Sequence, residues 1–366
     1  MNAFKKYSFL LIFLLILLPF ISLYLGGWLS FLSYLVLFAL VPGVDYFIRD
    51  SSNPNKDEEK WLSKDPFFKY LTYLYVPVHV GILILSAYLL SYYSFTWIEW
   101  IGFTLSIGLL TGGIGLTFAH ELMHKNSKLQ HFFSKVILVC VCYGHFFIEH
   151  VKGHHVRVAT PEDPATARLG QSLYQFLPKS IVGSFKSALQ LESQRLHRKN
   201  HSVYSLHNHF WWIILCPIMI ATLFFIYGGF SILAFYILQS MVAILLLETV
   251  NYIEHYGLER RKLNNQYYEK VSPYHSWNAN HWFSNIILLH LQRHSDHHTY
   301  GGRPYQILRH MEDSPQLPSG YLGMIILAFI PPLWRYVMDK RVLNYRAERI
   351  AKEVCSIDFT NPASEV

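Results

Sequence analysis

Nine histidines gather in four short segments of the sequence, with a spacing that suits metal coordination. The segments cover residues 120–124, 150–155, 251–257 and 294–298. Within three of them the histidines recur at i+3, i+4 or i+5, so that a helix turns them toward one face. Neutral imidazole is the commonest metal ligand among side chains, and nine are too many for one tetrahedral zinc ion. The pattern predicts a site for two ions of a metal that prefers nitrogen ligands. The candidate ligands are His120, His124, His150, His154, His155, His255, His294, His297 and His298.

Acidic residues stand beside these histidines and are candidates for a supporting role. They are Glu121, Glu254 and Asp296, with Asp163 following the second segment and Glu149 preceding it. A carboxylate can accept the N–H of a ligand imidazole and so fix the tautomer that faces the metal. The sequence leaves open whether one of them also binds a metal directly.

Other chemistries fit the pattern less well. Residues 120–124 match the HExxH signature of zinc proteases, but the other seven histidines would then have no role. A metal transporter would carry its ligands inside membrane spans, and the span interiors here are nearly free of them. Imidazole ligands alone leave zinc, copper, iron and nickel open.

The composition is that of a membrane protein. Hydrophobic residues make up 52% of the 366 residues and charged residues only 15%, against about 25% in soluble domains. The net charge of +7 therefore indicates charge asymmetry across a bilayer rather than nucleic-acid binding. The four cysteines form no CxxC pair, which excludes a built-in rubredoxin-type iron site.

Long apolar runs predict an all-α integral membrane protein, with residues 1–366 forming a single membrane-embedded catalytic domain. About 20 apolar residues cross a bilayer as a helix. The expected spans lie near residues 7–25, 28–48, 70–93, 97–118, 210–227 and 230–250. The apolar run 131–147 contains charged and histidine residues and is expected not to cross, and the run 321–334 is expected at the interface. The first run is too long for a cleavable signal peptide.

Six spans place the segments 119–209 and 251–320, and both termini, on one side of the membrane. All 31 lysines and arginines fall on that side, because the turns near residues 26–27, 91–96 and 228–229 contain none. The positive-inside rule makes this histidine-rich face cytoplasmic.

The four histidine segments closely resemble the signature boxes of the membrane-bound alkane monooxygenases. Residues 120–125, 149–155, 251–257 and 291–298 match the boxes HELxHK, EHxxGHH, NYxEHYG and LQRHSDHH. The third and fourth boxes are specific to that family, and the resemblance covers roughly residues 30 to 315. Membrane fatty acyl desaturases and hydroxylases share looser forms of the first two boxes. They remain the main alternative, although their first box is usually wider and they lack the third.

The resemblance implies a non-haem site with two iron ions held by the nine histidines, which uses O2 to oxidise the terminal carbon of a medium-chain alkane taken from the membrane lipid. It also implies electrons from a separate rubredoxin, reduced by an NADH-dependent rubredoxin reductase, at the bacterial inner membrane. Rubredoxins are typically acidic, so basic residues of the cytoplasmic segments are candidate donor contacts. These are Lys152, Arg157, Arg195, Arg198, Lys199, Arg303 and Arg309.

Overall fold

Helices make up nearly all of the regular structure, as the sequence predicts. The computed structural model describes residues 3–263 and 267–358. Within these ranges the only strand-like pairings are isolated bridges, such as that between Arg49 and His281.

Five helical stretches are long and apolar enough to cross a membrane. They are Lys5–Leu25, which contains α2 (Leu11–Leu25); Gly27–Phe47, which ends in α4 (Val41–Phe47); α6 (Pro66–Tyr92); Trp97–Met123, which joins α7 (Trp97–Leu109), η4 (Leu110–Gly115) and α8 (Leu116–Met123); and α13 (Phe210–His255).

The fifth stretch is a hairpin of two arms. Its backbone leaves the helical region at Gly228 and Gly229, and Gly229 takes a φ of 65° that favours glycine. Counting each arm of α13 separately gives the six spans that the sequence predicts. The second arm continues to His255, which lies at its last turn.

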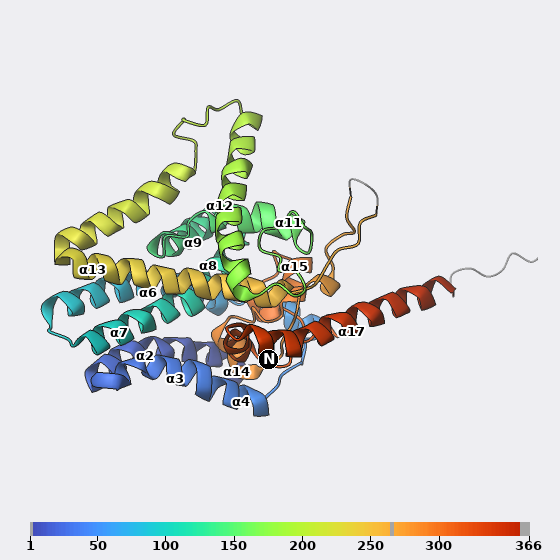
Figure 1. Cartoon of the computed structure of the whole chain (residues 1–366), viewed down its shortest axis with the longest axis horizontal. Coiled ribbons are helices and arrows are strands. Elements are labelled where there is room, and N and C mark those ends of the chain that lie inside the picture. Colours follow the sequence, from blue (N-terminus) through green and yellow to red (C-terminus); the bar gives the residue numbers. More distant parts are fainter. Residues whose placement is uncertain (1–2, 264–266, 359–366) are drawn as a thin grey trace, which may run out of the picture.

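The spans lie side by side across the view in Figure 1, with α13 along α6 and α7, and α2 against α7. Small residues allow the close contact between α7, η4 and α13. A Cβ atom at Gly108 would lie 2.6 Å from Cβ of Val242, and one at Gly112 would lie 2.6 Å from Cα of Ala243. These glycines bring α8, the continuation of this span, next to the second arm of α13.

The segment after α8 folds back along α8 and α6. Helix α9 (Lys128–Cys140) has only 13 residues and packs against α8 and α6. It is followed by α10 (Phe146–Glu149), the π-helix η5 (His150–His154), α11 (His155–Arg157) and the long α12 (Leu173–Arg198). The second histidine segment is thereby held near the first.

Three short helices follow in the last third of the chain. They are α14 (Trp282–Ile287), α15 (His294–Thr299) and α16 (Tyr321–Ala328), before α17 (Pro331–Asp358), which extends away from the body in Figure 1. Asp45 of α4 fixes the start of α14 by accepting the backbone N–H groups of Phe283 and Ser284, at 3.1 and 3.2 Å. Helix α16 packs against α13, and its Tyr321, Leu322 and Ile325 close one wall of the site, while Ile326 on its other side is exposed. The interfacial position of residues 321–334 stays a prediction.

Candidate metal centre

The nine histidines form two adjacent clusters of five and four. The five-histidine cluster contains His120, His124, His150, His155 and His297, and the four-histidine cluster contains His154, His255, His294 and His298. Within each cluster the candidate ligand atoms all lie within 4.8 Å of one another. The sequence predicted the nine members but not their division.

Helix α8 supplies two members of the first cluster. His120 and His124 are four residues apart, so both side chains leave the same face of the helix. His120 is buried whereas His124, at the end of the helix, is half-buried.

The π-helix η5 divides the second segment between the clusters. A π turn closes with i→i+5 hydrogen bonds, and here the N–H of His155 donates to the carbonyl of His150. Residues five apart then lie one above the other, so that His150 and His155 join the five-histidine cluster. His154 turns toward the four-histidine cluster.

Helix α15 also serves both clusters. His294 and His298, four residues apart, reach the four-histidine cluster, while His297 reaches the other one. His255 comes from the last turn of α13. The helix α15 therefore lies between the two centres.

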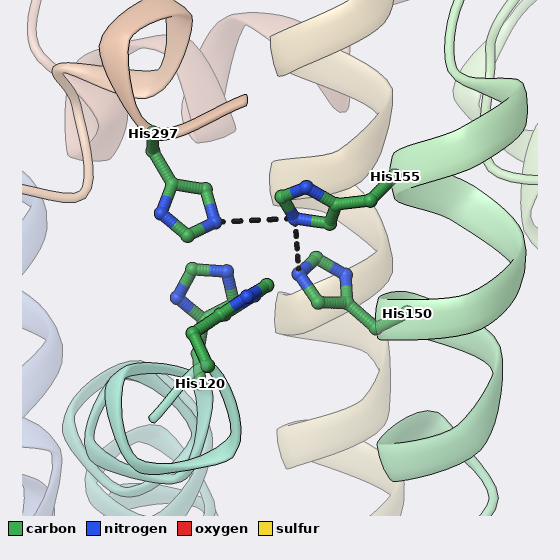
Figure 2. A group of neighbouring side chains, drawn as sticks. His120, His150, His155 and His297 are labelled. Carbon is green, nitrogen blue, oxygen red and sulfur yellow. Dashed lines mark hydrogen bonds between the residues drawn. The ribbon is translucent and has the colours of Figure 1, made fainter. Parts of the chain in front are cut away.

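Ring nitrogens converge within each cluster, as Figure 2 shows for His120, His150, His155 and His297. The Nε2 atom of His155 lies 3.1 Å from Nε2 of His150 and 3.2 Å from Nε2 of His297. Bonds of about 2.1 Å to one shared ion place neighbouring donor atoms roughly 3.0–3.4 Å apart. The observed separations fall within this range.

Several of these nitrogens have no hydrogen-bond partner among the described residues although they are buried. They include Nε2 of His120, His124 and His154, and both ring nitrogens of His298. An unpaired buried polar group costs about 1–3 kcal/mol, and metal ligation removes that cost. The donor set fits two ions of a nitrogen-preferring transition metal.

Burial also keeps most of the imidazoles neutral, which metal binding requires. Burial, reinforced by the neighbouring imidazoles, holds the pKa values of His124, His150, His155 and His297 well below the usual range. The same causes lower the pKa values of His294 and His298. His154 differs: burial alone would lower its pKa, but the combined effect of Asp163, Glu149 and Glu248 is greater and raises it.

Two acceptors orient imidazoles of the four-histidine cluster. Asp163 lies 2.9 Å from Nδ1 of His154 and also accepts the hydroxyl of Thr166. The carbonyl of His275 lies 3.2 Å from Nδ1 of His255. Each contact turns the Nε2 atom of its histidine into the cluster.

The other three candidate acids have different partners. Glu121 pairs with Lys125 at 2.7 Å, and Asp296 pairs with Arg303 at 2.7 Å. Glu254 instead lies 3.1 Å from Nε2 of His294 and accepts the hydroxyl of Tyr321 at 2.9 Å. Only Glu254 of these three contacts a candidate ligand in the described structure. Glu149 contacts Arg157 and Ser187.

An apolar cavity reaches both clusters from the side of the spans. His120, His150 and His294 lie at its metal end together with Glu254. Its walls come from η4, α8, α13 and α16 and are mostly aliphatic; they include Gly113, Leu116, Leu247, Leu291 and Ile325. The cavity is narrow, about 50 Å³, so its shape depends on every wall residue.

A second cavity of about 390 Å³ reaches only the five-histidine cluster; its lining mixes apolar residues with charged ones, and for the charged ones we call it the polar cavity. The half-buried His124 and His155 line it, with Lys125, Lys152 and the ion pair of Arg195 with Glu192. The four-histidine cluster, by contrast, is entirely buried.

Some residues at the site gave no clear signal in the sequence. Tyr321 stands in an ordinary apolar run, and the role of His275 is a backbone contact that no side-chain motif encodes. Lys125 belongs to the first box, and its spacing of four from Glu121 could have indicated their ion pair. The histidines that the sequence left outside the site lie outside both clusters; they are His79, His131, His145, His281 and His290.

Comparison with known proteins gives consistent matches. The family model for fatty acid desaturase matches residues 94–328. The chain is 43% identical over 358 residues to alkane 1-monooxygenase 1 of Pseudomonas aeruginosa, covering 95% of this chain and 93% of that protein. It is 41% identical over 354 residues to alkane 1-monooxygenase of Pseudomonas putida, covering 95% and 88%. It is 29% identical to the xylene/toluene monooxygenase hydroxylase component of Pseudomonas putida, over 78% and 77% of the two chains.

Proposed function

This chain belongs to the alkane 1-monooxygenase family, and from that premise we propose that it hydroxylates medium-chain n-alkanes at the terminal carbon. In this reaction one atom of O2 enters the C–H bond. The other oxygen atom takes up two electrons and two protons and leaves as water. The observation that carries the proposal is an apolar cavity that ends at two histidine clusters.

We assign two non-haem iron ions to the clusters, one to the five histidines and one to the four. The irons, when bound, supply the activation of O2 and the oxidation of the C–H bond. Asp163 and the carbonyl of His275 orient their imidazoles, and the aliphatic walls exclude water. Residues 1–366 act as one membrane-embedded catalytic domain.

Shape rather than polarity positions the substrate. An alkane offers no hydrogen-bonding group, so only close contact with the walls can hold one terminal carbon near the clusters. The cavity lies among the spans, which allows the substrate to enter from the lipid.

Electrons come from a separate rubredoxin, itself reduced by an NADH-dependent reductase, and enter at the five-histidine cluster. That cluster alone borders the polar cavity, where Lys152 is exposed. Of the other candidate contacts, Arg157, Arg195, Arg303 and Arg309 are held in ion pairs with carboxylates. Arg198 and Lys199 do not line the cavity. Lys152 is therefore the basic side chain best placed to attract an acidic donor.

We place the protein in the bacterial inner membrane with its histidine clusters and both termini on the cytoplasmic side. The distribution of lysine and arginine supports this orientation. A cytoplasmic polar cavity is also where a soluble donor would meet the enzyme.

The direct test supplies membranes with rubredoxin, its reductase, NADH and octane under ¹⁸O2. We expect 1-octanol that carries one ¹⁸O atom. The match to the fatty acid desaturase model makes acyl desaturation or hydroxylation the second candidate. An acyl substrate offered in parallel separates the two, because oxidation of the acyl chain without octanol formation would overturn the proposal.

A further inference from the structure

Helix α17 contacts the end of α13, where His255 lies, before it extends away from the body in Figure 1. His255 is the donor that α13 supplies to the four-histidine cluster. Two positions later, the carbonyl of Gly257 accepts two hydrogen bonds from the guanidinium of Arg346, at 2.6 and 3.0 Å. Trp334 of α17 packs on Tyr256, with ring centroids 5.2 Å apart. Side chains of α17 therefore hold the turn that directly follows the donor.

A second contact of α17 leads toward the same histidine. Nη2 of Arg349 donates to both carboxylate oxygens of Glu269, at 2.7 and 2.8 Å. The guanidinium also lies over the ring of Tyr274, 5.2 Å from its centroid. Oε1 of Glu269 lies 3.0 Å from Nε2 of His275. The side chain of His275 is fully buried, whereas those of Arg349 and Glu269 are 16% and 15% exposed. The ion pair thus stands at the edge of the fold with the histidine behind it.

The ring of His275 is held at both of its nitrogens. The backbone N–H of Ser272 donates to Nδ1 at 3.0 Å, so the ring proton lies on Nε2, which donates to Glu269. With the ring fixed, the carbonyl of His275 has little freedom to move. Its oxygen lies 3.2 Å from Nδ1 of His255. That contact leaves Nε2 of His255 directed into the cluster, 3.3 Å from Nε2 of His294.

We propose that Arg349 of α17 is a positioning residue for the metal ion of the four-histidine cluster. It acts through Glu269 and His275 on the orientation of His255. The inference rests on the proposed function in that the cluster holds a metal ion. His255 belongs to the four-histidine cluster and not to the other one, so a change at Arg349 should affect one centre and spare the other. An ion pair that only stabilised the fold would affect both centres alike.

The test measures how fast iron leaves the protein rather than turnover. Full-length holoprotein in detergent is mixed with the Fe²⁺ chelator ferrozine under reducing conditions, and the absorbance of the iron complex records the release of each ion. Arg349→Met removes the guanidinium, and Glu269→Gln removes the charge of its partner. Lys352→Met is the matched control, because Lys352 lies about one turn further along α17 and pairs with Asp313 at 3.2 Å instead. His298→Ala identifies the release phase of the five-histidine ion.

We expect the two ions of the wild-type protein to leave in two phases, of which His298→Ala keeps only that of the five-histidine ion. Arg349→Met and Glu269→Gln should each speed the other phase by roughly tenfold, the lower end of the effect of residues that orient metal ligands. Because both substitutions break the same contact, the double variant should release that ion no faster than either single variant. Lys352→Met should release both ions at the wild-type rates.

Wild-type release rates in Arg349→Met, or an equal acceleration of both phases, would overturn the positioning role. A double variant whose effect is the product of the two single effects would exclude a shared path. Should Arg349→Met fail to accumulate, Glu269→Gln provides the same comparison, since its amide oxygen can still accept from His275. A wild-type protein that holds fewer than two irons, or a His298→Ala variant that keeps both, would instead overturn the proposed metal clusters. The two failures are therefore distinguishable.

Discussion

The Nε2 atoms of His155 and His297 lie 3.2 Å apart, although 142 positions separate the two residues in the sequence. The contact joins α11 to α15 at the edge of the polar cavity. It also fixes which histidines share an ion, because His155 contacts His150 on its other side.

The division into clusters predicts the outcome of single histidine substitutions. His124→Ala removes a donor from the five-histidine cluster only, and His298→Ala removes one from the other cluster only. Each variant should lose about one of two irons per chain and nearly all hydroxylation, as measured by elemental analysis and product formation. His145→Ala is the matched control, because His145 is buried but lies outside both clusters. Retention of both irons in His124→Ala and in His298→Ala would refute the division.

The narrow apolar cavity predicts that Gly113 influences substrate length. A Cβ atom at Gly113 would lie 3.4 Å from Leu246, an ordinary contact, so that the helix can accept Gly113→Ala. One methylene group in an apolar pocket changes kcat/KM by roughly 10–200-fold. We expect the ratio of kcat/KM for short over long alkanes to rise by about tenfold. Gly81→Ala has open space around it and should leave the ratio unchanged. An unaltered ratio in Gly113→Ala would place the alkane elsewhere.

The short helix α9 predicts the topology of the central segment. Residues 128–140 form a helix of only 13 residues that packs against α8, so we expect that they do not cross and that a reporter fused after residue 148 gives a cytoplasmic readout. Fusions after residues 94 and 229 should give a periplasmic readout, since these turns lie at the opposite ends of the spans. A periplasmic signal after residue 148 would separate the first two histidine segments and contradict a shared site.

The polar cavity predicts salt-sensitive electron delivery. Lys152→Glu should lower kcat/KM for rubredoxin by about two- to fivefold at low ionic strength, because opposite charge speeds the encounter of donor and enzyme. Added salt should slow the wild-type reaction and reduce this difference. Lys64→Glu is a control, since Lys64 is exposed but does not line the cavity. Rates that are independent of both salt and Lys152 would place the donor on another surface.

Much of the architecture follows from patterns that a sequence displays directly. Apolar runs of membrane length predict the spans, and the pair Gly228–Gly229 predicts the turn within α13. The nine histidines are recognisable because imidazoles at helical spacing beside apolar runs would otherwise remain unpaired in a buried environment.

The division of the histidines could not be predicted in the same way. The spacing of His150 and His154 suggests a shared face in an α-helix, but the extra residue of a π turn separates them. The orientation of Glu254 depends likewise on Tyr321, which folding brings from 67 positions away. Such features arise from tertiary packing, which local periodicity does not record.

The way in which the two clusters share their segments also sets an order of assembly. Both draw on residues 150–155 and on α15, whereas α8 serves only one cluster and α13 only the other. A ribosome has therefore released every predicted span before it completes either donor set at residues 294–298. We therefore expect metal loading to follow membrane insertion, because each ion would link residues 150–155 to the later segment α15. Synthesis that stops before residue 294 would leave an inserted bundle of helices with four of the five histidines of one cluster and two of the four histidines of the other.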